Sequence, residues 1–277
     1  MRFHFDFSAS QILWTLTFAA ELVLLIVLMG RDRMRRFPWF TANIVVMALM
    51  LLVSRLLFGR MPAIITSSIF LALSSIAAVI GLMVVVELAR RAFAGAPRAG
   101  WLVGVFASLI IAIAVLVIWG PWPARNVFTG GPLLVTLRSL QLAADKGAVL
   151  GALLAIELGM AIVFFGRRFQ GGWRTHAQQI AIGLSTAGIA QLAVRVLWQA
   201  IATRAKIQTQ TEYQHLLDLR DRIYNANNLV FVLVLVWWIA WLWLDEPGAR
   251  SAGENAMQDV EEPAVETPAE APPPAAI

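Results

Sequence analysis

The sequence predicts an all-α fold, an integral membrane bundle of seven helices that each cross the bilayer. Two observations carry this prediction. The chain is 59% apolar and only 14% charged, which is too apolar for a soluble domain. Its apolar residues also fall into separate runs, and about 20 such residues are needed to cross roughly 30 Å of hydrocarbon. The expected spans are residues 10–30, 39–58, 63–89, 101–119, 142–165, 176–201 and 223–244.

The basic residues between these runs predict the orientation of the bundle. The connections after the first, third and fifth runs hold ten Arg, and the intervening connections are less basic. Short cytoplasmic loops of membrane proteins are rich in Lys and Arg. We therefore expect these three connections and the C-terminus in the cytoplasm, and the N-terminus outside. This is the topology of a multi-pass protein of a bacterial-type inner (plasma) membrane.

Tryptophan positions agree with this orientation. Trp39, Trp101 and Trp173 each follow a basic connection and begin the next span, where Trp is expected at the depth of the lipid headgroups. Four more crowd the end of the last span. We interpret these four as an interfacial anchor, and an aromatic ligand cage is the alternative; they are Trp237, Trp238, Trp241 and Trp243.

Three segments outside the spans have distinct compositions. Residues 246–277 are rich in Pro, Ala and Glu with almost no large apolar residue, so we expect a disordered acidic cytoplasmic tail. Residues 202–222 are polar without Gly or Pro, which predicts helical extensions of the sixth and seventh spans beyond the membrane. Residues 120–141 contain several Pro and Gly, which predicts a loop with an interfacial segment.

Two parts of the chain have similar sequences. The sequence from Glu21, ELVLLIVLMGR, is matched by ELGMAIVFFGR from Glu157, and Trp39-Phe-Thr is matched by Trp173-Arg-Thr at the start of the following spans. Chance similarity between apolar segments is one explanation. The other is a pair of parallel three-helix repeats joined by the fourth span, an arrangement found in some transporters.

This pattern resembles the three-plus-one-plus-three plan of SWEET-type sugar transporters and opsin-like proteins, and it is similar in topology to the seven-helix sensor regions of bacterial receptors. The resemblance implies a role in transport or sensing. Retinal binding is not expected, because the only lysines are Lys146 and Lys206, and neither lies in the last span where a Schiff base would form.

Ionisable residues within spans are costly, so each is a candidate functional residue. Glu21 and Glu157 lie near the middle of the membrane and are candidates for carrying a proton or charge; hydrogen bonding to a neighbouring helix is the alternative. Polar residues near the outer ends of the second, fifth, sixth and seventh spans are candidates for a ligand-binding vestibule that faces outward, with structural hydrogen bonding as the alternative. They are Arg55, Asp145, Lys146, Gln191, Arg195, Asn225 and Asn228. Because Arg55 and Arg195 outnumber Asp145, the expected ligand is a small anion.

Two further features suggest structural roles. Small residues recur at every fourth position of the fifth span, which predicts a helix-packing face within the bundle or between subunits. Glu87 precedes Arg90 and Arg91 by one helical turn, which predicts an ion pair on the surface. The packing positions are Ala143, Gly147, Gly151, Ala155 and Gly159.

No sequence motif indicates an enzyme. The chain has no Cys and only three His, and it lacks the spacings of nucleophile elbows, zinc helices and phosphate-binding loops. We therefore expect no catalytic residue, metal or cofactor and no nucleic-acid partner. The expected partners are the lipid bilayer, a small anionic ligand, and either a second copy or a signalling protein. The leading interpretation is a sensor or receptor module; the alternatives are a small-solute or proton-coupled transporter and a structural partner subunit.

Overall fold

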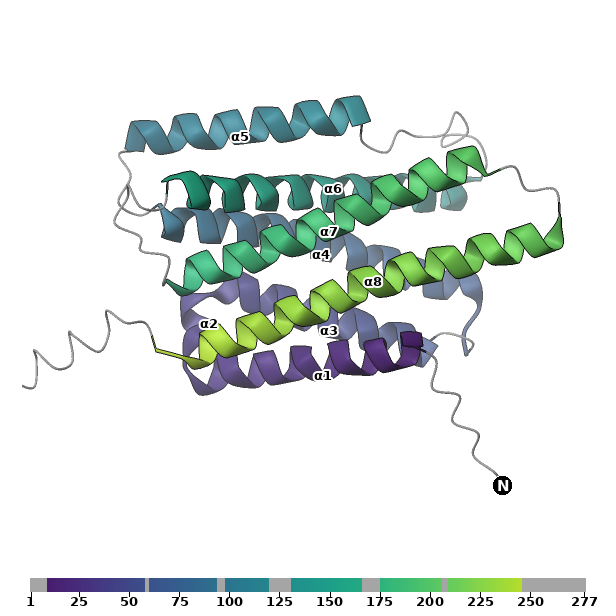
Figure 1. Cartoon of the computed structure of the whole chain (residues 1–277), viewed down its shortest axis with the longest axis horizontal. Helices are drawn as coiled ribbons and strands as arrows, with labels where there is room; N and C mark the ends of the chain where they lie inside the picture. Colours follow the sequence, from purple (N-terminus) through teal and green to yellow (C-terminus); the bar gives the residue numbers. More distant parts are fainter. Residues whose placement is uncertain are drawn as a thin grey trace, which may run out of the picture. The chain divides into compact units, whose positions relative to one another are not determined.

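The computed structural model describes residues 9–57, 60–93, 98–119, 131–165, 175–205 and 209–245. These residues form α-helices (Figure 1). The expected tail, residues 246–277, lies outside the described residues. The helices are α1 (Ala9–Gly30), α2 (Arg33–Arg36), α3 (Pro38–Leu57), α4 (Ala63–Ala92), α5 (Arg98–Trp119), α6 (Pro132–Phe165), α7 (His176–Arg204) and α8 (Gln210–Trp243).

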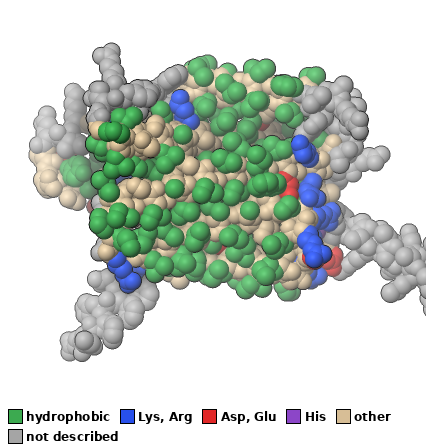
Figure 2. Space-filling view, turned by 180° about the vertical axis from the view of Figure 1, so that it is seen from behind, with side chains coloured by type: hydrophobic (Ala, Val, Ile, Leu, Met, Phe, Trp, Pro, Cys, Tyr) green, Lys and Arg blue, Asp and Glu red, His purple; other side chains and the backbone are tan. Residues whose placement is uncertain are grey.

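Six of these helices are long and apolar enough to cross a membrane: α1, α3, α4, α6, α7 and α8. The apolar part of α5 that meets the same description is shorter, Val103–Trp119. Large apolar side chains lie on the surface of these helices, with exposed fractions such as 67% at Ile26 and 75% at Phe164. Figure 2 shows one face covered by apolar side chains, with Lys and Arg gathered towards its two ends. Such a surface suits lipid rather than water, and the chain is a polytopic α-helical membrane protein.

The helix contacts follow a regular scheme. Helix α3 packs against α1 and α4, and α7 packs against α6 and α8. These two groups of three meet where α1 contacts α8 and where α4 contacts α6 and α7. Within the described residues, α5 contacts only α6, and Figure 1 shows it along the edge of the bundle.

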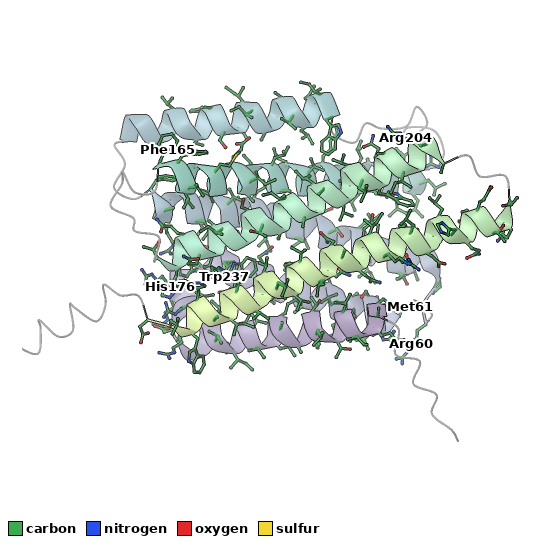
Figure 3. The ribbon with its side chains drawn as sticks, in the orientation of Figure 1. Arg60, Met61, Phe165, His176, Arg204 and Trp237 are labelled. Atoms are coloured by element: carbon green, nitrogen blue, oxygen red, sulfur yellow. The ribbon has the colours of Figure 1, made fainter. Side chains whose placement is uncertain are left out.

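The ends of the helices alternate between two ends of the bundle. One end holds Arg31–Arg36 with Arg90 and Arg91, and we call it the basic end. Phe165 and His176 lie there, whereas Arg60, Met61 and Arg204 lie at the opposite end, which we call the far end (Figure 3).

Two helices are longer than a single crossing requires. Helices α6 and α8 each have 34 residues, or about 50 Å at the helical rise. Helix α8 begins beyond its expected span, with a capping box in which Thr209 and Glu212 satisfy each other's backbone N–H groups. Helix α6 also begins earlier than expected, at Pro132, because residues 133–141 contain neither Gly nor Pro. That stretch is therefore helical rather than a loop.

Small residues mark the close approaches of α6. A Cβ added at Gly147 would lie 2.9 Å from the Cβ of Ala78 in α4, and one added at Gly159 would collide with Ser185 in α7. Ala155 is buried in the core, whereas Ala143 is exposed. Gly151 differs from our expectation, because a Cβ there would meet no atom within 4 Å. Helix α6 thus packs closely against α4 at Gly147 and against α7 at Gly159.

One residue of the tryptophan cluster belongs to the core. Trp238 is 1% exposed, its ring lies edge-on to Phe40 at 5.0 Å, and its indole N–H donates to the carbonyl of Ile180 at 3.3 Å. Gly183 gives this indole its space, because a Cβ there would collide with it. The anchor interpretation is therefore wrong for Trp238. Trp243 is exposed, and the Arg31 guanidinium lies 5.0 Å above its ring.

Candidate functional site

Buried polar side chains gather at the basic end of the bundle. Seven of them lie within about two helical turns of that end, and each is less than 9% exposed. They come from both groups of three helices and from the α2 segment. Polar groups withdrawn from water need partners or a function, so this set, which we call the basic-end cluster, is the best candidate site. Its members are Arg33, Thr41, Asn43, Glu87, His176, Gln178 and Gln179.

Three groups distant in sequence meet within this cluster. Arg33 Nη1 lies 2.7 Å from His176 Nδ1 and 2.8 Å from Nε2. Arg33 Nη2 donates to the Leu244 carbonyl at 2.9 Å, and His176 Nε2 lies 2.9 Å from the same oxygen. The guanidinium thus joins the first residue of α7 to the C-cap of α8. Hydrogen bonds that involve a charged group are stronger than neutral ones.

Glu87 forms the expected pair with Arg91, but its side chain is buried and has a second partner. It is 8% exposed, and its Oε2 accepts a hydrogen bond from the backbone N–H of Phe40 at 3.1 Å. Its Oε1 lies 3.8 Å from Arg91 Nη2. The pair with Arg91 is therefore confirmed, whereas its expected place on the surface is wrong. The buried carboxyl group also caps the first turn of α3, where helix N–H groups have no partner within the helix.

Glu21 lies deeper in the bundle, on α1. Its side chain is 1% exposed, and its Oε2 atom has no hydrogen-bond partner among the residues that the structure describes. Leu24, Leu28 and Leu235 are among the buried apolar residues of this core. A carboxyl group in such surroundings lacks the compensation that buried polar groups normally have. Packing in the core therefore does not explain why a Glu stands at position 21.

Glu157 faces a different environment. It is only half-buried, and its Oε2 accepts a hydrogen bond from the Ser108 hydroxyl of α5. Glu21 and Glu157 each lie nine residues before a Gly-Arg pair, so they lie at a similar depth. One points into the core and the other towards the peripheral helix. The sequence similarity around Glu21 and Glu157 therefore does not give these two carboxyl groups equivalent surroundings.

The far end holds the residues expected to form a vestibule. Close contacts pair Gly159 with Ser185 and Gly188 with Ala152, which shows that α6 and α7 are antiparallel. About two helical turns further along, this register brings Asp145 level with Arg195. Both are half-buried, and no ion pair joins them in the part of the chain that the structure describes. Lys146 and Asn225 are half-buried, and Gln191 and Asn228 are exposed.

Arg55 is grouped with other residues than those expected. Its helix, α3, packs against α1 and α4, and its guanidinium lies 5.9 Å from the Trp14 ring of α1. These two residues line a groove of about 600 Å³ at the far end, together with Ser10, Gln11, Ile12, Thr15, Leu16 and Ser54. The structure thus places Arg55 beside α1 rather than with Asp145 and Arg195.

The sequence predicts functional polar residues at the far end, whereas the structure has most of its buried polar side chains at the basic end. Arg33 is one of four Arg in its connection, and nothing in the sequence distinguishes it from its exposed neighbours. His176 is the one His expected at that end of the bundle, as the first residue of the sixth expected span, and this was the available signal. Which face of a mostly apolar helix points inward cannot be seen from such a sequence.

The fold and the basic-end cluster define a class, the polytopic helical membrane proteins, here with buried polar side chains gathered at one end of an apolar core. The comparisons do not narrow this class. No family model matches the chain, and no curated protein or solved structure shows significant similarity to it.

Proposed function

We propose that the chain is a non-enzymatic small-solute carrier of a bacterial-type inner membrane, built from two parallel three-helix halves. The first half is α1, α3 and α4, the second is α6, α7 and α8, and α5 makes the seventh crossing between them. The N-terminus lies outside and the basic end faces the cytoplasm, as Lys and Arg near short loops favour.

The observation that carries this proposal is the pattern of helix contacts. The two halves correspond when α1 is matched with α6, α3 with α7, and α4 with α8. Under this matching the α1–α3 contact corresponds to α6–α7, the α3–α4 contact to α7–α8, and the α1–α8 contact to α4–α6. All six of these contacts occur. The α4–α7 contact has a weaker counterpart in the ring contact between Phe40 of α3 and Trp238 of α8. Such internal symmetry is typical of carriers, whose halves rock about a central site.

Glu21 supplies the second element of the proposal. A buried carboxyl without a hydrogen-bond partner is the group that a proton-coupled carrier would load and unload. Glu157 is the less suitable candidate, because Ser108 already occupies its Oε2.

Transport in proteoliposomes tests this function. Radiolabelled amino acids, sugars and small carboxylates are assayed for uptake driven by a pH gradient and for exchange without a gradient. We expect one class to be taken up, and Glu21→Gln to abolish gradient-driven uptake while exchange remains. The absence of uptake and exchange for every solute would contradict the proposal.

A sensor is the second candidate, favoured by the groove that Arg55 and Trp14 line at the far end. A guanidinium beside an indole suits an anionic ligand. Thermal stabilisation by a carboxylate from the same panel, lost in Arg55→Gln and unaccompanied by transport, would support the sensor instead.

A further inference from the structure

The bonds between Arg33, His176 and Leu244 connect the two halves of the bundle. Arg33 belongs to α2, between the first two helices of the first half, whereas His176 begins α7 and Leu244 follows α8 in the second half. Arg33 and His176 are 7% and 2% exposed. Any motion that separates the halves at the basic end must therefore break these bonds.

The imidazole of His176 can serve both of its neighbours. A guanidinium can only donate hydrogen bonds, and Arg33 Nη1 lies almost equally near the two ring nitrogens, 2.7 Å from Nδ1 and 2.8 Å from Nε2. The Leu244 carbonyl can only accept, and His176 Nε2 lies 2.9 Å from it. With two ring nitrogens, the imidazole can accept from Arg33 and donate to Leu244 at the same time.

The segment that carries Arg33 is suited to moving as a small unit. Helix α2 has four residues, and it is preceded by Asp32, which has a φ of 49°. Residues other than Gly seldom adopt this left-handed conformation. The neighbouring side chains of Met34, Arg35 and Arg36 are exposed, so a small displacement would bring Arg33 into water beside them.

We propose that Arg33, His176 and the Leu244 carbonyl form a latch that closes the basic end of the bundle, and that its release opens this end. The inference rests on the two-half carrier proposed above. The latch is closed in the structure, so it defines the state sealed towards the side that the basic end faces.

Distances between spin labels test the latch, and the chain has no native Cys to interfere. Nitroxides on Met34→Cys and Phe165→Cys report the separation of the halves at the basic end, in full-length protein in lipid nanodiscs. Both positions are exposed, at 51% and 50%. A second pair, Met61→Cys and Thr203→Cys, reports the far end.

We expect Arg33→Gln to add a population at longer distance in the basic-end pair, and His176→Ala to do the same. Arg35→Gln removes an equal charge from an exposed neighbour and should leave the distribution unchanged. His176→Gln retains a side-chain acceptor and donor, and should restore the short distance in part. If Arg33→Gln does not fold, His176→Ala decides.

Unchanged basic-end distances in both Arg33→Gln and His176→Ala would overturn the latch. An equal change in Arg35→Gln would also overturn it, because the cause would then be general loss of charge. These results are separate from the transport assay. Opening without transport would refute the carrier alone, and transport with unchanged distances would refute the latch alone.

Discussion

The hydroxyl of Ser108 donates a hydrogen bond to the Oε2 atom of Glu157, and it links the peripheral helix α5 to α6. Because α5 contacts no other helix in the described part of the chain, this bond should matter for its attachment. Ser108→Ala should lower the free energy of unfolding by about 1 kcal/mol, measured by thermal unfolding in detergent. Ser67→Ala, at an exposed position of α4, is the matched control. An equal loss in both variants would contradict a specific link.

Gly183 should tolerate no side chain. A Cβ there collides with the indole of the buried Trp238, and overpacking a core costs about 1–3 kcal/mol. Gly183→Ala should therefore reduce thermal stability. Gly151→Ala makes the same chemical change where a Cβ meets open space, and it should be neutral or stabilising because Ala favours helix. Destabilisation by Gly151→Ala alone would show that the tight contact lies elsewhere.

Replacing Glu21 by Leu should separate stability from function. The substitution removes a buried oxygen that has no hydrogen-bond partner, so we expect a gain of about 1 kcal/mol or more in stability. The same variant should abolish gradient-driven uptake in proteoliposomes. Glu157→Leu is the comparison, because it breaks the bond to Ser108 and should destabilise. A destabilised Glu21→Leu variant would mean that Glu21 has a structural partner.

Asp145 and Arg195 should be energetically independent in this conformation. They lie level on adjacent helices without an ion pair, so the losses from Asp145→Asn and Arg195→Gln should add within about 0.5 kcal/mol in a double-mutant cycle on thermal unfolding. A ligand-binding vestibule that held both side chains close together would instead couple them. A coupling energy above this limit would show that Asp145 and Arg195 interact, and it would support a site for an anionic ligand there.

The orientation can be checked by chemical labelling. Met34→Cys at the basic end and Thr209→Cys at the far end are both exposed. In intact cells, a membrane-impermeant maleimide should modify the cysteine at position 209 and spare the one at position 34, because Arg-rich connections stay in the cytoplasm. The cysteine-free parent is the background control, and permeabilised cells should label at both positions. The reverse pattern of labelling would show that the bundle has the opposite orientation in the membrane.

Six spans and the two ends of the bundle could be predicted because they depend on quantities that the sequence states directly. Run length and composition decide whether a helix crosses the bilayer, and Arg positions mark one end. The long start of α8 followed from the absence of Gly and Pro in residues 209–222. These properties do not depend on which helix lies beside which.

The inward face of each helix could not be predicted in the same way. In water-soluble proteins the apolar side of a helix is the buried side, but here lipid-facing and core-facing residues are both apolar. Glu21 and Glu157 have nearly the same local sequence, and one is buried while the other meets α5. Trp238 and Trp243 are five residues apart, and one is core while the other is surface. Only the packing of neighbours separates such residues.

The isolation of α5 has a consequence for how the protein could be divided. A helix that contributes one contact surface to the bundle can be cut from it with little loss of packing. Two separately expressed chains, one ending before α5 and one beginning at α6, would each insert three helices and still possess the α1–α8, α4–α6 and α4–α7 surfaces needed to find each other. Restored uptake from two such fragments would show that α5 connects the two halves of the chain and is not needed for transport.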